Sequence, residues 1–234
     1  MKKIFGLILA CIMMLGSFGQ GKSFAESGDQ IPKDIILKDY NEGIENGWIG
    51  EDVAYEEYEN SVVESIRLEK ALSNSEDFIQ VPFTTMSSGD IIMTNGTSSA
   101  GLTGHAAIAQ HSSSIIHIEG VGKKASLITT NEFKKKYSNN GKNWIRVYRH
   151  KTSTAGRQAS IWALNNYINN SNHTYKITTD RKSTNETYCS KIVWQAYYYG
   201  AGSSSVASTS LTGIITPYGL DDSTIKYINH IGDM

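Results

Sequence analysis

The sequence predicts an α+β fold in which an antiparallel sheet packs against helices. Short β-rich runs cluster between residues 78 and 150, and helical patterns lie before and after them. Strands that follow one another without intervening helices suit an α+β arrangement better than repeating βαβ units. A chain of 234 residues is long enough for one such domain with an extension.

Composition and charge narrow the classes of function. Hydrophobic residues make up 39% of the chain, which a packed core requires and a disordered chain lacks. The 22 Lys and Arg residues are balanced by 23 Asp and Glu residues, and there is no long basic block. We therefore expect no nucleic-acid partner.

Residues 1–25 have the layout of a secretory signal peptide. Two lysines precede an uncharged, mostly apolar run from Ile4 to Phe18, and small residues at positions 23 and 25 suit a cleavage site. The run is shorter than the roughly 20 residues of a spanning helix. We expect cleavage after Ala25, a secreted or cell-wall-associated protein, and no stable membrane insertion afterwards.

Residues 26–76 are predicted to form an N-terminal helical extension. Apolar residues recur at mostly helical spacing between residues 51 and 73, with acids in the first turns and Arg67 and Lys70 near the end. This pattern predicts a helix of about 20 residues. Its expected role is to pack against the main domain or to act as a spacer.

Residues 77–234 are predicted to form the catalytic domain. The alternation of Trp144, Arg146 and Tyr148 with apolar and basic neighbours is a period-two strand signal. The expected strands cover residues 78–81, 89–93, 105–110, 114–119 and 143–150. The expected helices cover residues 155–169 and 188–199, and a short one is capped by Thr130-Asn131-Glu132-Phe133.

Cys189 is the candidate nucleophile. Thr187 is expected to be the N-cap of the helix, which places Cys189 in the first turn, where the positive helix end favours a thiolate. Cleavage of the leader removes Cys11 and leaves Cys189 unpaired. A thiolate nucleophile is what acyl transfer through a covalent intermediate requires. The alternative is a buried, inert cysteine.

A histidine base and an orienting group are also available. His105 begins an apolar strand with small neighbours, and it is the favoured base among six histidines. In the next strand His117 and Glu119 alternate, so both side chains point to one face. If the two strands pair, either residue could hold the second imidazole nitrogen and complete a nucleophile, base and orienter arrangement.

Four segments carry a family resemblance: Gly89-Asp90-Ile91-Ile92, Gly104-His105-Ala106-Ala107-Ile108, His117-Ile118-Glu119-Gly120 and Tyr188-Cys189-Ser190. In their order and spacing they resemble the circularly permuted NlpC-type papain-like hydrolases of the YiiX/YebB kind. The resemblance runs from about Phe78 to the C-terminus. It implies a papain-like fold in which the histidine strand precedes the cysteine helix.

The resemblance also implies roles for single residues. It implies Cys189 as nucleophile, His105 as base and Glu119 as third member, with Tyr188 lining the substrate pocket. Related lecithin retinol acyltransferase-like proteins use a second histidine as third member, which keeps His117 as the alternative.

Three functions are compatible with these residues. The favoured one is a secreted cysteine peptidase or amidase that cleaves an amide bond, with cell-wall peptides as substrate. The alternatives are a lipid acyl hydrolase or acyltransferase, and a non-catalytic binding module. The sequence offers no amphipathic basic helix for membrane docking, which disfavours the lipid alternative. No metal and no cofactor is expected, because the histidines are dispersed and no HExxH or CxxC motif occurs.

Overall fold

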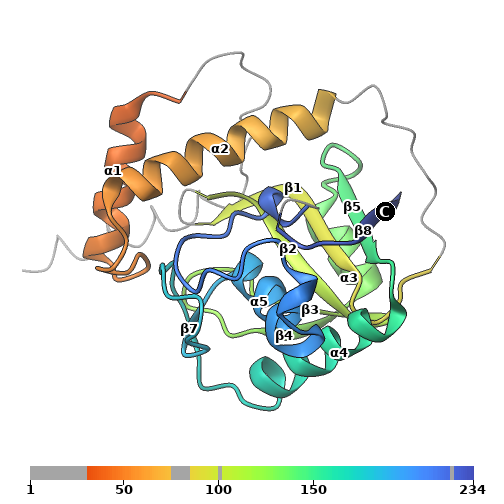
Figure 1. The fold of residues 1–234 in the computed structure, drawn as a ribbon. Helices are drawn as coiled ribbons and strands as arrows, with labels where there is room; N and C mark the ends of the chain where they lie inside the picture. Colours follow the sequence, from red (N-terminus) through yellow and green to blue (C-terminus); the bar gives the residue numbers. More distant parts are fainter. Residues whose placement is uncertain (1–30, 75–84, 100–101, 222–223) are drawn as a thin grey trace, which may run out of the picture.

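The computed structural model describes residues 31–74, 85–99, 102–221 and 224–234 (Figure 1). The predicted signal peptide and the predicted strand at residues 78–81 lie outside the described residues.

One antiparallel sheet organises the described part of the chain. Its strand order is β4-β3-β2-β1-β5-β8, so β2 and β1 are central and β4 and β8 lie at the edges. The strands are β1 (Ile91–Ser99), β2 (Leu102–His111), β3 (Ser114–His117), β4 (Ser126–Thr129), β5 (Ile145–His150) and β8 (Ile228–Asp233). Together with the helices this sheet confirms the predicted α+β class.

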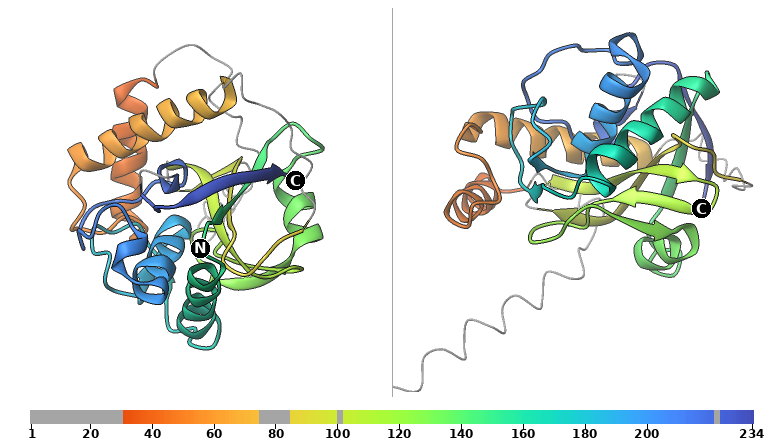
Figure 2. Two further views of the ribbon diagram at one scale, coloured as in Figure 1. Left: turned by 45° about the vertical axis from the view of Figure 1, so that its right-hand side comes forward. Right: turned by 90° about the horizontal axis from the view of Figure 1, so that it is seen from below.

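Helices cover both faces of the sheet, with α4 and α5 on one face and α3 on the other (Figure 2). The α-helices are α1 (Lys33–Glu45), α2 (Tyr55–Asn74), α3 (Thr130–Tyr137), α4 (Ser153–Ala163) and α5 (Cys189–Gln195). Helices α4 and α5 continue as π-helical turns over Leu164–Ile168 and Ala196–Ala201. The short strands β6 (Thr174–Tyr175) and β7 (Glu186–Thr187) pair in parallel before α5.

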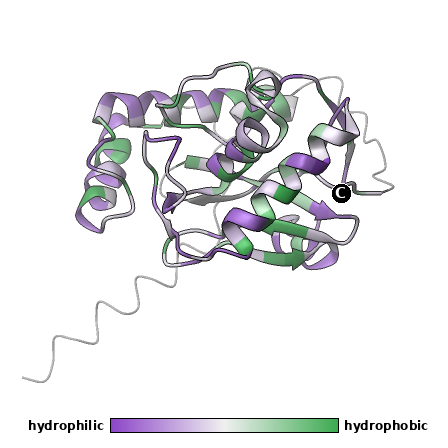
Figure 3. Ribbon diagram, turned by 60° about the horizontal axis from the view of Figure 1, so that its bottom comes forward, coloured by the Kyte–Doolittle hydropathy of each residue, from purple (hydrophilic) through white to green (hydrophobic). Residues whose placement is uncertain are grey.

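The alternation of side chains along β2 divides the core into two clusters. Ala106 and Ile108 belong to the larger cluster, which includes α5, whereas Ala107 and Ala109 pack with residues of α3. Figure 3 shows the central strands as largely hydrophobic and the helices as mixed. A mixed helix buries one face and exposes the other. Strand β2 is therefore buried on both faces.

The predicted helical extension packs against the rest of the protein. Tyr58, Val62 and Ile66 of α2 are buried in the same cluster as α5. The Ser65 hydroxyl lies 2.8 Å from the Thr103 hydroxyl of β2. Packing, one of the two expected roles, is thus confirmed, and α2 does not act as a spacer.

Two details of the helix predictions were wrong. Helix α3 is capped by Thr129, one residue earlier than expected, because Thr129 and Glu132 form a reciprocal capping box. Thr187 is not the N-cap of α5; that position is taken by Tyr188. Thr187 lies in β7 instead, where its carbonyl accepts the Lys176 N–H and its hydroxyl donates to Tyr167.

Candidate active site

Cys189 is the first residue of α5 and is almost completely buried. Ile192 and Val193, three and four residues on, are buried with it. Because these residues anchor the helix in the core, the thiol is held against the central strand β2. The predicted first-turn position is confirmed although the predicted cap is wrong.

The environment of Cys189 opposes the predicted thiolate. Burial raises the pKa of the thiol, and hydrogen bonds from the backbone N–H groups of Ala106 and Ser190 offset this only in part. The expectation of a depressed pKa from the helix end is therefore wrong for this conformation. Desolvation of the charged form outweighs the local dipoles, so the resting thiol is neutral.

His105 is fully buried and neutral. Burial lowers the pKa of its imidazole well below the ordinary value, and the neighbouring His117 lowers it further. Its ring stacks on Tyr137 of α3 at 4.8 Å between centroids. Neither ring nitrogen has a hydrogen-bond partner among the described residues. The imidazole is therefore unprotonated and has a free lone pair, as a general base requires.

The backbone before His105 is built for close packing. Gly104 has a positive φ of 83°, which side chains disfavour. A Cβ at this position would also lie 2.4 Å from the ring of Tyr218. Only glycine therefore allows Tyr218 to cover the strand beside His105.

Cys189 approaches β2 next to His105, but the two side chains lie on different sides of this strand. The thiol contacts the N–H of Ala106, the residue after His105. The His105 ring packs on the α3 side, whereas Cys189 belongs to the cluster on the α5 side. No hydrogen bond joins the thiol to the imidazole in the described residues. The structure therefore does not bring the predicted nucleophile and the predicted base into contact.

His117 is the polar neighbour of His105. The two rings meet edge to face at 5.6 Å, and His117 Nδ1 lies 3.2 Å from the Tyr137 hydroxyl. Burial lowers the pKa of His117 to about 4, although the Glu119 carboxylate acts in the opposite direction. Both histidines are therefore neutral near pH 7.

Glu119 is bound by Lys136 and lies near enough to His117 for its charge to act on that imidazole. Its carboxylate accepts a hydrogen bond from Lys136, and its side chain is 36% exposed. That bond is the main reason why the pKa of Glu119 is lowered. The structure thus brings His117 beside His105 and places Glu119 on Lys136.

Tyr188 supports the chain around the cysteine. It is completely buried, and its hydroxyl accepts the Ile215 N–H at 3.0 Å. Ser190, on the other side of Cys189, donates to the Ile215 carbonyl at 2.6 Å. Both neighbours of the cysteine therefore hold the segment at Ile215. In this structure Tyr188 has no exposed surface with which to line an open pocket.

Two hollows adjoin this region. A groove of about 790 Å³ lies between α2 and residues 208–224, and Ile215 is part of its wall. A more open cleft of about 550 Å³ has His117, Glu119 and Leu127 among its lining residues. The cleft therefore reaches the end of β3, whereas the groove reaches the segment at Ile215 that holds the neighbours of Cys189.

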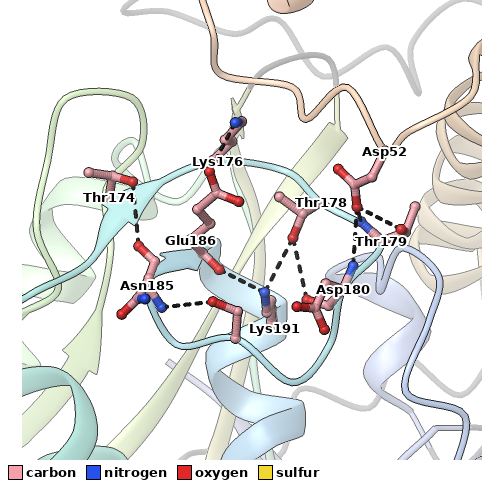
Figure 4. Close-up of polar contacts among 10 residues, drawn as sticks. Asp52, Thr174, Lys176, Thr178, Thr179, Asp180, Asn185, Glu186 and Lys191 are labelled. Carbon is pink, nitrogen blue, oxygen red and sulfur yellow. Dashed lines mark hydrogen bonds and ion pairs between the residues drawn. The ribbon is translucent and has the colours of Figure 1, made fainter.

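Sequence reasoning missed a buried lysine two residues after the cysteine. Lys191 is completely buried, and its ammonium donates to the Glu186 carbonyl at 2.7 Å and to the Thr178 hydroxyl at 3.3 Å (Figure 4). Burial lowers its pKa to about 8. A lysine within the apolar stripe of the cysteine helix was the available signal.

The same network ties the N-terminal segment to the loop before α5. Asp52 accepts hydrogen bonds from the backbone and hydroxyl of Thr179, at 2.7 and 2.6 Å (Figure 4). Its pKa is lowered because these bonds together outweigh the cost of burial. Residues 176–187 are thus fixed from both ends.

The described residues contain no cluster of three or more His, Cys, Asp or Glu side chains that could hold a metal ion. Within the same residues, no helix combines the length and the hydropathy needed to cross a membrane.

The fold and the site together define an α+β protein with a buried cysteine at a helix start and a buried histidine pair on the adjoining strands. Residues 59–230 match the family described as "Lipoprotein N-acylation protein LnsA-like". The chain belongs to this family. The matched region begins within α2, earlier than the expected start of the catalytic domain at residue 77.

One curated relative extends this comparison. A Bacillus thuringiensis protein described as "Uncharacterized 30.3 kDa protein" is 42% identical over 145 residues. The alignment covers 59% of this chain and 53% of the relative, so the chain spans about half the length of that protein. No solved structure matches the chain.

Proposed function

We propose that this protein is a cysteine acyltransferase that takes an acyl group from a lipid onto Cys189 and passes it to an amine. The observation that carries the proposal is the position of Cys189 at the start of α5, with its sulfur at the N–H of Ala106, the residue after His105. The proposal requires the His105 ring to reach the sulfur when substrate is bound. The family description, lipoprotein N-acylation, supports a lipid-linked amine as acceptor.

In the first half-reaction the sulfur attacks the carbonyl carbon of a lipid ester while the thiol proton moves to His105. The C–O bond breaks, the proton passes to the leaving alcohol oxygen, and a thioester on Cys189 remains. In the second half an amine attacks the thioester, its excess proton returns to the thiolate through His105, and an amide and a free thiol result. The N–H groups of Ala106 and Ser190 stabilise negative charge on the sulfur.

His117 rather than Glu119 is proposed as the group that orients His105. His117 meets the His105 ring edge to face and is fixed by Tyr137, whereas Glu119 is engaged by Lys136. A paired-histidine site matches the lecithin retinol acyltransferase-like alternative of the sequence analysis. The papain-like, YiiX-type fold and the export through a signal peptide remain part of this proposal.

The family match supports lipid acyl transfer better than cleavage of cell-wall peptides. The sequence favoured a secreted peptidase, but the description of the matched family, lipoprotein N-acylation, does not support that activity. A hydrolase would release a carboxylate from the thioester by attack of water. The buried position of Cys189 limits the access of water to that thioester.

Trapping the acyl-enzyme tests this function. The protein is incubated with phospholipid vesicles, and its intact mass is measured with and without hydroxylamine, which cleaves thioesters. We expect a mass increase of one acyl chain that hydroxylamine removes and that Cys189→Ala lacks. Adding a lipopeptide with a free amine should discharge the thioester into an amide. Cleavage of wall peptides without any acylation of Cys189 would contradict the proposal.

A further inference from the structure

One short part of the chain carries an excess of positive charge on exposed lysines. Residues 119–137 contain five lysines and two glutamates, a net charge of +3 in a chain whose total is −1. All five lysines are exposed; they are Lys123, Lys124, Lys134, Lys135 and Lys136. Residues 142–157 are also basic, with five Lys and Arg residues and no Asp or Glu. There, however, Arg146 is paired with Asp233 and Arg149 with Asp90.

Helix α3 directs its lysines outward because its apolar side is buried. Phe133 and Tyr137 pack into the sheet beside His105, and the three lysines between them remain on the surface. Helix α3 is thus a short amphipathic basic helix, which the sequence analysis did not recognise. Because its apolar side is used by the core, it cannot lie in a bilayer on that side.

Exposed apolar side chains flank the lysines. Val121 in the β3–β4 loop is 44% exposed, and Leu127 on the edge strand β4 is 47% exposed. Leu127, Lys135 and Lys136 line the same cleft. Lys123 lies near this cleft, because its charge contributes to the lowered pKa of Glu119, which lines the cleft.

We propose that the surface formed by residues 121–127 and the lysines of α3 docks on a bilayer containing anionic phospholipid. Each lysine near such a surface strengthens binding about fivefold. Val121 and Leu127 would enter the interfacial layer, as apolar residues of peripheral proteins do. The cleft that reaches His117 would then open toward the lipid.

The exposed side chains of Val121 and Leu127 distinguish a bilayer from a soluble polyanion as the partner. A polyanion would need the lysines only, whereas a bilayer also uses the two exposed apolar side chains. Vesicle binding is measured without turnover. The docking proposal can therefore be refuted while the proposed acyl transfer is retained, and the acyl transfer can be refuted while docking is retained.

Vesicle flotation tests the docking surface. Wild-type protein is compared on vesicles of phosphatidylcholine alone and of phosphatidylcholine with about one third phosphatidylglycerol. We expect binding to the anionic vesicles that weakens with salt and little binding to the neutral ones. The triple variant Lys123→Gln/Lys134→Gln/Lys135→Gln should bind at least tenfold more weakly. Equal binding to both kinds of vesicle would overturn the proposal.

The matched control removes the same charge elsewhere. Lys38, Lys151 and Lys182 are also exposed and lie outside this surface, so their triple Gln variant should keep most of the vesicle binding. If both triple variants lose binding equally, net charge and not this surface is responsible, and the proposal fails. Melting curves of each variant verify that the fold is retained.

Leu127→Asn tests the apolar contribution. It should weaken binding to anionic vesicles severalfold and leave binding to soluble polyphosphate unchanged. Unchanged vesicle binding together with strong polyphosphate binding would assign the surface to a soluble polyanion. Cys189→Ala should bind vesicles like the wild type, since docking does not use the thiol.

Discussion

At the scale of single residues, burial sets the protonation states of the proposed site. It raises the pKa of the Cys189 thiol and lowers the pKa of the His105 imidazole, so each group is held in its neutral form. A thiolate–imidazolium pair is therefore not the resting state. The proton has to leave the sulfur as the sulfur attacks, and a neutral His105 is able to accept it.

This protonation state predicts a pH profile. The base is lost only when His105 becomes protonated, and its lowered pKa places that event well below pH 6.5. We expect kcat/KM for acyl transfer to stay nearly constant from pH 8 down to pH 6.5 and to fall only at lower pH. A profile that already falls by half at or above pH 6.5 would show that His105 is not the base in this environment.

A second residue-scale prediction separates the two candidates for the third member. His117→Ala should reduce kcat by about tenfold to a hundredfold, because His105 loses its polar neighbour. Glu119→Gln should have a smaller effect, because the carboxylate binds Lys136. Single-turnover rates on acyl donor vesicles measure both, with melting temperatures as the control for folding. A larger loss for Glu119→Gln would restore the carboxylate as orienting group.

The sequence singles out Cys189, His105 and His117 as candidates, but it does not show how the structure arranges them. Alternation in the expected strand 114–119 places His117 and Glu119 on one face, but β3 ends at His117. Pairing of β3 with β2 brings His117 beside His105. What alternation cannot show is that α3 supplies Lys136 to Glu119 and Tyr137 to His117. Which partner each side chain takes depends on how α3 packs against β3, and the sequence pattern of β3 does not contain that information.

At the scale of elements, the strongly patterned strands and helices were predictable and the edges were not. Strands β1, β2, β3 and β5 carry clear alternation or apolar runs and were expected close to their observed positions. Strands β4 and β8 were missed. Each is an edge strand with partly exposed residues, and so neither shows the pattern of a buried strand. Helix α1 was missed because three of its apolar residues are consecutive, with Ile36 buried and its neighbours Ile35 and Leu37 exposed, which is not the spacing of one helix face.

The loop before α5 yields a prediction about stability and pH. Folding lowers the pKa of Lys191 from about 10.4 in the unfolded chain to about 8. The folded state therefore disfavours the charged form, and this penalty is complete below pH 8 and disappears as the pH rises toward 10.4. The free energy of unfolding should rise across this window by up to about 3 kcal/mol relative to Lys191→Met.

Urea unfolding of wild type and Lys191→Met at pH 7, 8 and 9 measures this difference. Lys38→Met, an exposed lysine of α1, serves as the control and should show no such trend. A constant difference in unfolding free energy between wild type and Lys191→Met over these pH values would refute the shifted pKa. Comparison with the variant also removes the contribution of buried tyrosines that titrate at higher pH.

At the scale of the whole molecule, the N-terminal helices and the sheet form one structural unit. The buried face of α2 shares a hydrophobic cluster with the cysteine helix. Polar contacts reinforce it: the Arg146 guanidinium donates to the Leu72 carbonyl at 2.7 Å, and the Ile214 N–H donates to Glu57 at 3.1 Å. The family match, which begins at residue 59, includes most of α2.

This shared core predicts that residues 77–234 do not fold alone. Removing residues 26–76 uncovers the core where Tyr58, Val62 and Ile66 pack, and burial of such side chains contributes about 1.5 to 3 kcal/mol each. The sum is comparable with the 5–15 kcal/mol that stabilises a typical domain.

We expect residues 26–234 to unfold in one cooperative transition and residues 77–234 to show none, as followed by circular dichroism and calorimetry. Ile66→Ala in the longer chain is the graded control, and it should lower stability by about 2 to 5 kcal/mol and keep the single transition. Cooperative unfolding of residues 77–234 within a few degrees of the longer chain would instead establish an independent catalytic domain with a dispensable extension.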